Sequence, residues 1–290
     1  MRTLRTVAEL RAALAEPRRC RRTIGLVPTM GALHAGHLSL IEAAREAADE
    51  VVVSLFVNPA QFNEAADLEA YPRDERRDAA LAAEAGADLL FAPSVDDIYP
   101  PGFSTQVRVG GPLTETLEGA HRGAEHFHGV TTVVTKLLNM ADPDVVFFGQ
   151  KDAQQALVIR RLAADLDLPV RIEVSPTVRE PDGLALSSRN VLLQGDDRRR
   201  ALALNQALRA AEQALAAGTA DAAALEHAAR AAMHDFDVEP EYLALVDPET
   251  LAPVDTVDQE TLLAVAARLG RVRLIDNTIL SPNGAGSGRH

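Results

Sequence analysis

The stretch that most constrains the fold of this chain is residues 23–41. Residues 23–27 are mostly apolar and β-branched, which is typical of a buried strand. Residues 28–31 carry the proline and glycine of a tight turn, and apolar residues return at helical spacing from about His34 onward. Because a strand that turns into a helix is the basic unit of a parallel α/β sheet, this stretch favours that class of fold.

The predicted helix start carries two histidines, His34 and His37, on one helical face. Free backbone N–H groups and the helix dipole favour an anion at such a position, and Gly36 leaves room for a flat ring against the backbone. We therefore expect a cradle for a nucleotide triphosphate. The spacing alone is also typical of surface histidines, and a zinc pair would need a third ligand that the neighbouring sequence lacks.

Two later segments repeat this pattern of a buried strand followed by polar residues. Residues 50–57 form an apolar run that predicts a strand buried on both faces, and Gln61 follows in the next loop. Residues 144–149 predict another core strand, which leads into Lys151, Asp152 and a helix. Polar residues beyond the carboxyl ends of parallel strands lie where open α/β sheets bind ligands. We expect these side chains to face the same crevice as the histidines, although each could be an ordinary solvated loop residue.

A short motif, Ser187-Ser188-Arg189, suits a phosphate clamp, since two hydroxyls can donate and the guanidinium offers a planar charged fork. An ordinary helix cap would explain the same residues if they stood alone.

Two segments between the predicted strands are harder to assign. Residues 104–109 alternate in polarity and predict an edge strand, and residues 119–129 are rich in His, Gly and polar residues, which predicts a mobile loop. That loop contains Arg122, His126 and His128. The two histidines have the spacing of metal ligands on a strand, but no partner cysteines or acids converge on them in the sequence.

The character of the chain changes after about residue 184. Two Ala-rich helices are predicted over 196–217 and 221–234, followed by short strands separated by turns. This succession predicts an α/β protein with a Rossmann-like parallel-sheet domain and a smaller α+β domain with a short antiparallel sheet. We place the first domain at residues 1–184, the second at 185–280, and a disordered tail at 281–290.

The composition excludes several classes of partner. The net charge of −13 is incompatible with the broad basic face that nucleic acid requires. No apolar run has the length of a membrane span, and the N-terminus lacks the hydrophobic core of a signal peptide. The single cysteine, Cys20, excludes an internal disulfide and fits a reducing compartment. We expect a cytoplasmic protein whose partners are small molecules.

Taken together, the motifs resemble the pantoate–β-alanine ligase (pantothenate synthetase) family, which belongs to the His-x-Gly-His nucleotidyltransferase group. Each motif alone is weak, but the ordered set is specific and covers nearly the whole chain. The matching stretches are residues 28–37, 56–62, 71–73, 126–134, 147–152, 154–155, 187–190, 245–251 and 273–277.

The resemblance implies a reaction of pantothenate and coenzyme A biosynthesis. Pantoate and ATP would form pantoyl adenylate and pyrophosphate, and the amine of β-alanine would then displace AMP to give pantothenate. The resemblance also implies that ATP acts with Mg²⁺ and that the protein is a homodimer. It assigns no residue to the metal.

The resemblance also implies residue roles. His37 would be a proton donor that contacts phosphate, with His34 and Lys151 as its catalytic partners, and Gln61 and Gln155 would bind the substrates by holding the pantoate hydroxyls and carboxylate. Val178 would contact adenine through its backbone. The implied ATP-binding residues are Met30, Gly31, Ala32, Leu33, His34, Ala35, Gly36, His37, Gly149, Gln150, Lys151, Asp152, Val178, Leu186, Ser187, Ser188 and Arg189.

Three departures from the family pattern are visible. The segment from Arg122 to His126 is one residue longer than usual and lacks a proline, Gln150 replaces a glutamate, and Leu186 replaces a methionine. None of them removes a charged catalytic group.

Two other functions remain possible at this stage. A nucleotidyltransferase that releases its adenylated product is disfavoured by Gln61, Gln155 and the second domain. A nucleotide-binding protein without activity is disfavoured because Lys151, both histidines and the Ser-Ser-Arg motif occur together.

Overall fold

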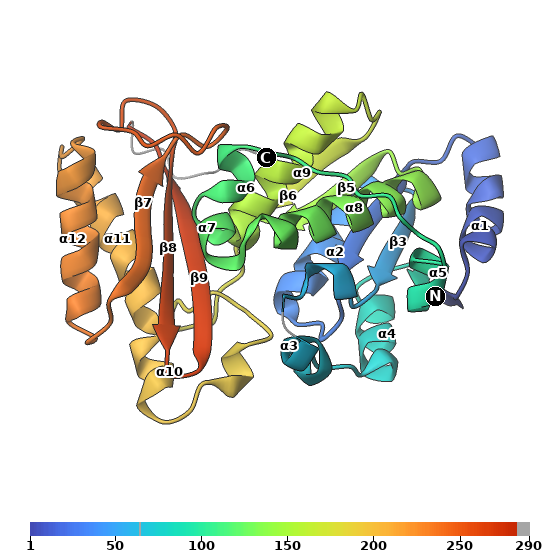
Figure 1. The fold of residues 1–290 in the computed structure, drawn as a ribbon, viewed down its shortest axis with the longest axis horizontal. Coiled ribbons are helices and arrows are strands. Elements are labelled where there is room, and N and C mark those ends of the chain that lie inside the picture. The colour runs from blue at the N-terminus through green and yellow to red at the C-terminus, as the bar shows by residue number, and fades with distance from the viewer. Residues whose placement is uncertain (64, 283–290) are drawn as a thin grey trace. The chain divides into compact units, whose positions relative to one another are not determined.

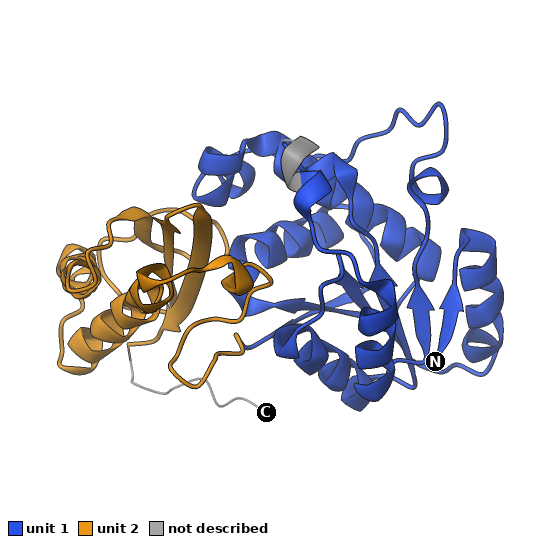
Figure 2. Ribbon diagram, turned by 90° about the horizontal axis from the view of Figure 1, so that it is seen from below, with its two compact units in different colours: residues 1–176 blue, residues 177–290 orange. Residues whose placement is uncertain are grey.

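Residues 1–63 and 65–282 are described by a computed structural model, which divides into two compact units, Met1–Pro176 and Thr177–His290 (Figure 2). Among the described residues, the first unit contains a six-stranded parallel sheet with helices and the second a three-stranded antiparallel sheet. The predicted fold class is therefore confirmed.

The sheet of the first unit has the strand order β1-β4-β3-β2-β5-β6, and all neighbouring strands are parallel. Leu26 of β2 lies beside Val52 of β3 on one side and Val146 of β5 on the other. From β2 the chain adds β3 and then β4 on one side of the sheet, and it then crosses to add β5 and β6 on the other side. The boundary between β2 and β5 is therefore a topological switch point. The strands are β1 (Arg2–Leu4), β2 (Ile24–Thr29), β3 (Glu50–Leu55), β4 (Leu89–Phe91), β5 (Val145–Gly149) and β6 (Arg171–Ser175).

Helices α2, α8 and α9 pack along this sheet (Figure 1). The helix α2 buries Ile41 and Ala44 against Val51 and Val53 of β3. A side chain at Gly25 of β2 would meet Ala48 at 3.0 Å, so glycine permits the close approach of this helix. The helices of the unit are α1 (Val7–Arg19), α2 (Ala35–Ala47), α3 (Ala65–Ala70), α4 (Glu75–Glu84), α5 (Val95–Ile98), α6 (Pro112–Glu115), α7 (Glu118–Arg122), α8 (Ala124–Ala141) and α9 (Ala153–Asp165), with 3₁₀ turns η1 (Pro59–Gln61) and η2 (Gln150–Asp152).

The second unit packs two Ala- and Leu-rich helices, α11 and α12, against its sheet. Its core includes Leu204, Leu208 and Leu225 from the helices and Leu263 and Val265 from the central strand. Its elements are η3 (Asn190–Leu192), α10 (Asp196–Arg200), α11 (Leu202–Ala216), α12 (Ala222–His234), β7 (Pro240–Val246), β8 (Thr261–Leu269) and β9 (Val272–Leu280). Across residues 1–63 and 65–282, no helix combines the length and the apolar character that crossing a bilayer requires.

The two units divide between Pro176 and Thr177, before the boundary that we expected at residue 184. Arg179 accounts for the difference, because its guanidinium donates to the buried carboxylate of Asp276 on β9 at 2.6 and 3.0 Å. Residues 177–184 therefore fold with the second unit. Of the predicted tail, residues 283–290 lie outside the described part of the chain.

Two local predictions were wrong. Residues 104–109 form no strand, since the N–H of Val107 donates to the Thr132 hydroxyl on α8 at 3.0 Å instead of entering a sheet. The predicted mobile loop over residues 119–129 is helical, belonging to α7 and α8. At Gly129 an added Cβ would lie 2.2 Å from the carbonyl oxygen of Ala60. The close contact between α8 and η1 therefore requires glycine at this position. This packing outweighs the low helix propensity of glycine, which had suggested a loop.

Candidate active site

Three neighbouring strands of the first unit end at the predicted site. The chain leaves β2 into residues 30–37, β3 into residues 56–61, and β5 into residues 149–152. The strands are parallel, so these segments lie at the same edge of the sheet, at its topological switch point. The charges of Lys151 and Asp152 act on the pKa of both His34 and His37. The structure therefore places His34, His37, Lys151 and Asp152 at one edge of the sheet, and Gln61 contacts Met30 of the same region.

The two histidines are held by hydrogen bonds to the backbone at the start of α2. His34 is the N-cap, and its Nδ1 accepts from the N–H of Gly36 at 3.1 Å. The Nδ1 of His37 accepts from the N–H of His34 at 3.4 Å, and the two ring centroids are 4.2 Å apart. Because Nδ1 of each ring is an acceptor, each neutral ring carries its proton on Nε2. Each imidazole can thus offer one Nε2–H donor to a ligand.

Both histidines are neutral at pH 7. Burial, and after it the charge of His34, lowers the pKa of His37 to about 3. Burial, and after it the positive charge of Lys151, also lowers the pKa of His34. An anion bound beside the rings would act in the opposite direction. In the unliganded protein the pair therefore supplies hydrogen-bond donors rather than fixed positive charges.

The turn before α2 differs from our expectation of free backbone N–H groups. The N–H groups of Ala32 and Leu33 donate to the Asp78 carboxylate, each at 2.8 Å. Those of His34 and Gly36 donate to the imidazoles as described above. These donors have internal partners, so contact with an anion falls to the imidazole Nε2–H groups and to Lys151.

Lys151 places a positive charge in a partly buried position at this edge of the sheet. Its side chain is 18% exposed, and Nζ lies 3.7 Å from a carboxylate oxygen of Asp152. It stands within η2, just before α9, where the helix dipole disfavours a cation. A bound anion would compensate for both the burial and the dipole.

Gln61 lies at the end of η1 and faces the histidine loop. Its Nε2 is 3.0 Å from the sulfur of Met30, and its Oε1 accepts from Nδ2 of Asn58 at 3.0 Å. Asn58 is buried and also accepts from the hydroxyl of Tyr99 at 2.8 Å. Its position directly after a buried strand was the signal that it shapes the site.

His126 is joined to the same loop in spite of the unusual length of its segment. Its Nδ1 lies 2.8 Å from the carbonyl oxygen of Gln61. Burial, and after it the charge of Arg122, lowers the pKa of His126 to about 4. Arg122 is held by Glu118 at 2.9 Å. The segment from Arg122 to His126 therefore still places a histidine beside the backbone of Gln61, in spite of its extra residue.

The two glutamines at the start of α9 have different surroundings. Gln154 is buried, and its amide bonds the N–H of Glu118 and the carbonyl groups of Leu113 and Thr116, each at 2.9 Å. Gln155 is only partly buried. The structure thus gives Gln154 a role in packing and leaves Gln155 as the candidate for substrate contact.

The remaining predicted ATP-binding residues belong to the second unit. Val178 and Leu186 are joined by a backbone hydrogen bond of 3.0 Å, and the N–H of Arg189 donates to the hydroxyl of Ser187 at 3.2 Å. These residues and Ser188 are partly exposed. The predicted ATP-binding residues are therefore distributed over both units.

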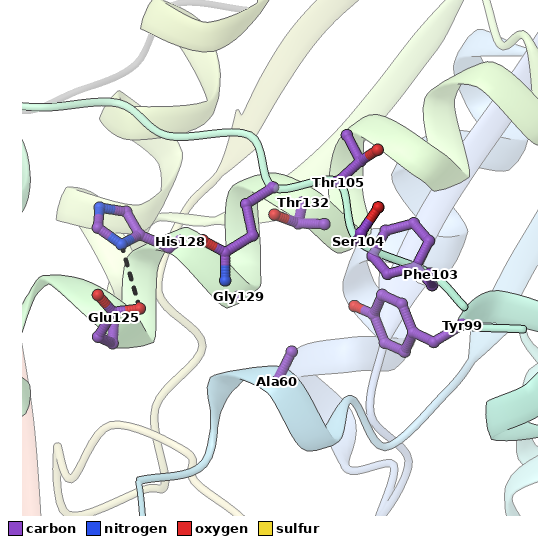
Figure 3. A pocket seen from close by; sticks show the side chains of 10 residues that line it. Ala60, Tyr99, Phe103, Ser104, Thr105, Glu125, His128, Gly129 and Thr132 are labelled. Carbon is purple, nitrogen blue, oxygen red and sulfur yellow. Dashed lines mark ion pairs between the residues drawn. The ribbon is translucent and has the colours of Figure 1, made fainter. Parts of the chain in front are cut away.

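His128 and Glu125 line a hollow beside η1. Residues 1–63 and 65–282 contain no group of three or more His, Cys, Asp or Glu side chains arranged to hold a metal ion. His128 approaches Glu125 at 3.4 Å, and both line a cavity of about 260 Å³ beside η1 (Figure 3). The cavity is lined by Ala60, Tyr99, Phe103, Ser104, Thr105, Gln106, Glu125, His128, Gly129 and Thr132, and by none of the predicted ATP- or substrate-binding residues.

Comparisons with known proteins agree with the family resemblance. Residues 2–279 match the family model described as pantoate-beta-alanine ligase. The pantothenate synthetase of Chelativorans sp. (strain BNC1) is 55% identical over 273 residues, which cover 94% of this chain and 95% of that protein. The pantothenate synthetase of Moorella thermoacetica is 50% identical, over 98% of this chain and 100% of that protein.

Two solved structures extend the comparison. The crystal structure of pantothenate synthetase from Thermus thermophilus has a TM-score of 0.92 and 49% identity, covering 97% of this chain and all of that one. A pantoate-beta-alanine ligase from Francisella tularensis, complexed with beta-gamma ATP and beta-alanine, has a TM-score of 0.79 and 34% identity, with coverage of 96% and 97%.

Proposed function

This chain belongs to the pantoate–β-alanine ligase family, and on that premise we propose which of its residues carry the reaction. The protein is an ATP-dependent ligase that condenses pantoate with β-alanine through a pantoyl adenylate, releasing pyrophosphate and AMP. The observation that supports our residue assignment is the position of Lys151 after β5 and of His34 and His37 after β2, the two strands that flank the switch point of the sheet.

In the first step, a pantoate carboxylate oxygen attacks the α-phosphorus of ATP, and the bond from that phosphorus to the leaving pyrophosphate breaks. Two anions must approach each other, which is costly in a partly buried site unless donors and cations intervene. Lys151 would supply the positive charge, and the Nε2–H groups of His34 and His37 would donate to the phosphate oxygens. Because these groups are in place before ATP arrives, they lower the barrier without reorganising.

Residues 30–37 and 149–152 of the first unit would bind ATP, and the family resemblance assigns further ATP contacts to residues of the second unit. Ser187, Ser188 and Arg189 would contact the triphosphate, and the backbone of Val178, beside Leu186, would contact adenine. Arg189 suits phosphate because its guanidinium is planar and can donate two parallel hydrogen bonds.

Pantoate would be held by the amides of Gln61 and Gln155. Gln61 supports this role because Asn58 fixes its side chain at 3.0 Å and Met30 lies against it. Fixing the carboxylate for in-line attack is a positioning effect, which requires side chains that are themselves held in place.

In the second step, the β-alanine amine attacks the acyl carbon of pantoyl adenylate. The carbon–oxygen bond to AMP breaks, and the amine nitrogen loses a proton as the amide forms. AMP is a good leaving group, so this step needs no strong acid. It does need water to be kept away from the adenylate until the amine arrives.

Mg²⁺ enters this proposal as part of the ATP substrate. The described residues lack a cluster of three protein ligands, and Mg²⁺ is commonly held through substrate phosphates with one or two carboxylates. Asp152, whose side chain is 53% exposed beside Lys151, would be a suitable carboxylate. We further propose a cytoplasmic homodimer, which rests on the family resemblance and on the single cysteine.

The reaction route can be tested with pantoate labelled with ¹⁸O in its carboxylate. One labelled oxygen should appear in each AMP, because the oxygen that attacks phosphorus stays with AMP when the amide forms. Unlabelled AMP would exclude the acyl adenylate. Release of the adenylate without consumption of β-alanine would instead indicate a nucleotidyltransferase.

A further inference from the structure

A buried carboxylate, Asp78 on α4, holds the turn that leads into the histidine pair. The side chain is 1% exposed. One oxygen accepts from the N–H of Ala32 and the other from that of Leu33, both at 2.8 Å. Ala32 and Leu33 lie 46 and 45 positions before Asp78 in the chain. The contact therefore ties α4 to the turn that precedes α2.

The turn that Asp78 holds is conformationally demanding. Gly31 has φ of +88° and Ala32 has φ of +52°, both in the left-handed region. For a residue with a side chain, such as alanine, that region costs about 1 kcal/mol or more. An added Cβ at Gly31 would lie 3.0 Å from a carboxylate oxygen of Asp78, so the carboxylate is packed directly against the turn. Leu33 then enters the core, and His34 begins α2.

A carboxylate is the side chain that suits this position. Two adjacent N–H groups need two acceptors, and an ionised carboxylate offers both. An amide of the same shape offers one oxygen and turns its NH₂ toward the second N–H. Burying a charge costs free energy unless the charge is paired and hydrogen-bonded. A carboxylate is therefore expected here only if the two backbone N–H groups require its hydrogen bonds.

We propose that Asp78 is a positioning residue for ATP. Its carboxylate holds the turn in which Gly31 and Ala32 are left-handed, and this fixes where α2 begins. The Nε2–H groups of His34 and His37 are thereby oriented toward the phosphates. Hydrogen bonds within the protein hold the turn in this shape, which lowers the ordering cost of binding. The inference rests on the proposed role of the histidine pair in binding ATP.

The test compares Asp78→Asn with Asp74→Asn, a matched change at the start of the same helix. Asp74 caps α4 by accepting from the N–H of Arg77 at 3.0 Å. We measure KM for ATP and for β-alanine, kcat of adenylation, and thermal stability. Asp78→Asn should raise the KM for ATP by about tenfold, as expected when a binding loop loses its preorganisation, and leave the KM for β-alanine unchanged. Asp74→Asn should change the melting temperature little, because asparagine caps a helix about as well as aspartate does, and it should change the KM for ATP by less than about twofold.

Two further variants keep the proposal testable if Asp78→Asn fails to fold. Gly31→Ala strains the same turn from the other side and should raise the KM for ATP in the same way. Asp78→Glu keeps both acceptor oxygens and should retain more ATP affinity than Asp78→Asn does. Equal effects of Asp78→Asn and Asp74→Asn would overturn the proposal, as would an unchanged KM for ATP in folded Asp78→Asn or in Gly31→Ala.

A failure of the underlying ATP assignment gives a different result. If His37→Asn and Lys151→Ala both leave ATP use unchanged, the histidine pair does not bind the triphosphate. If those variants impair ATP use and Asp78→Asn does not, only the role of Asp78 is wrong.

Discussion

The two segments proposed to bind ATP are built differently in the two units. In the first unit, the turn at residues 30–37 is fixed by Asp78, by two imidazole caps and by burial. In the second unit, residues 187–189 are partly exposed, and the hydrogen bond at 3.2 Å from Arg189 to Ser187 joins near neighbours. Fixed donors act most strongly where charge develops during reaction, whereas adaptable ones contribute mainly to binding. We therefore expect Lys151 of the first unit to act mainly on kcat and Arg189 of the second unit to act mainly on the KM for ATP.

The largest effect is expected for Lys151→Ala. Loss of this charge should lower the rate of adenylation by about 10²–10³, as for other donors that act on a transition state, and should leave the fold intact. Single-turnover formation of pyrophosphate from pantoate and ATP measures this rate.

A matched control exists because the chain has only one other lysine, Lys136. Lys136 lies on α8, with Nζ 4.7 Å from the centre of the Phe103 ring. Lys136→Ala should leave the adenylation rate within about twofold, since this cation contacts an aromatic ring and not the site. A nearly normal adenylation rate in Lys151→Ala would show that this residue of the first unit does not stabilise the transition state.

Arg189→Lys should have a smaller effect of a different kind. The substitution keeps the charge but removes the planar fork, so the KM for ATP should rise about tenfold while kcat falls less than about threefold. Steady-state kinetics with varied ATP separates the two parameters, and Arg209→Lys on the exposed surface of α11 is the control. A fall in kcat comparable to that of Lys151→Ala would mean that both units act on the transition state, and the contrast between them would not hold.

The parts of the site that could be predicted from sequence are those encoded by local patterns. Neighbouring residues predict the buried strand before residue 30 and the glycine turn after it. They also predict the transition from β5 to the segment that contains Lys151. The family motifs then indicated which polar residues to assign to the proposed site. The fold class followed from the same alternation of strands and helices.

The parts that could not be predicted depend on contacts between distant residues. Asp78 reads as an ordinary helical aspartate until the fold brings it to Ala32, 46 residues away. The unit boundary depends on the pairing of Arg179 with Asp276, 97 residues apart. Local propensity carries no trace of either contact, which is also why Gly129 was taken for part of a loop.

The smallest predicted effect concerns stability at mildly acidic pH, and it should belong to the first unit. Unfolded histidine titrates near pH 6.5, whereas folded His37 has a pKa of about 3 and folded His126 of about 4. Between these values the unfolded chain binds more protons than the folded one, so the free energy of unfolding falls as the pH falls. Each histidine contributes a slope of at most about 1.4 kcal/mol per pH unit below about pH 6.5.

Denaturant unfolding between about pH 7 and pH 5 measures this slope, in the window below the unfolded pKa. His37→Asn should make the dependence shallower, whatever its effect on stability at neutral pH, because the variant loses one proton that only the unfolded chain takes up. His227→Asn, at an exposed position on α12 of the second unit, should keep the slope of the unmodified protein. If His227→Asn flattened the curve and His37→Asn did not, the acid sensitivity would lie in the second unit, and the buried imidazole pair would no longer distinguish the first unit from the second.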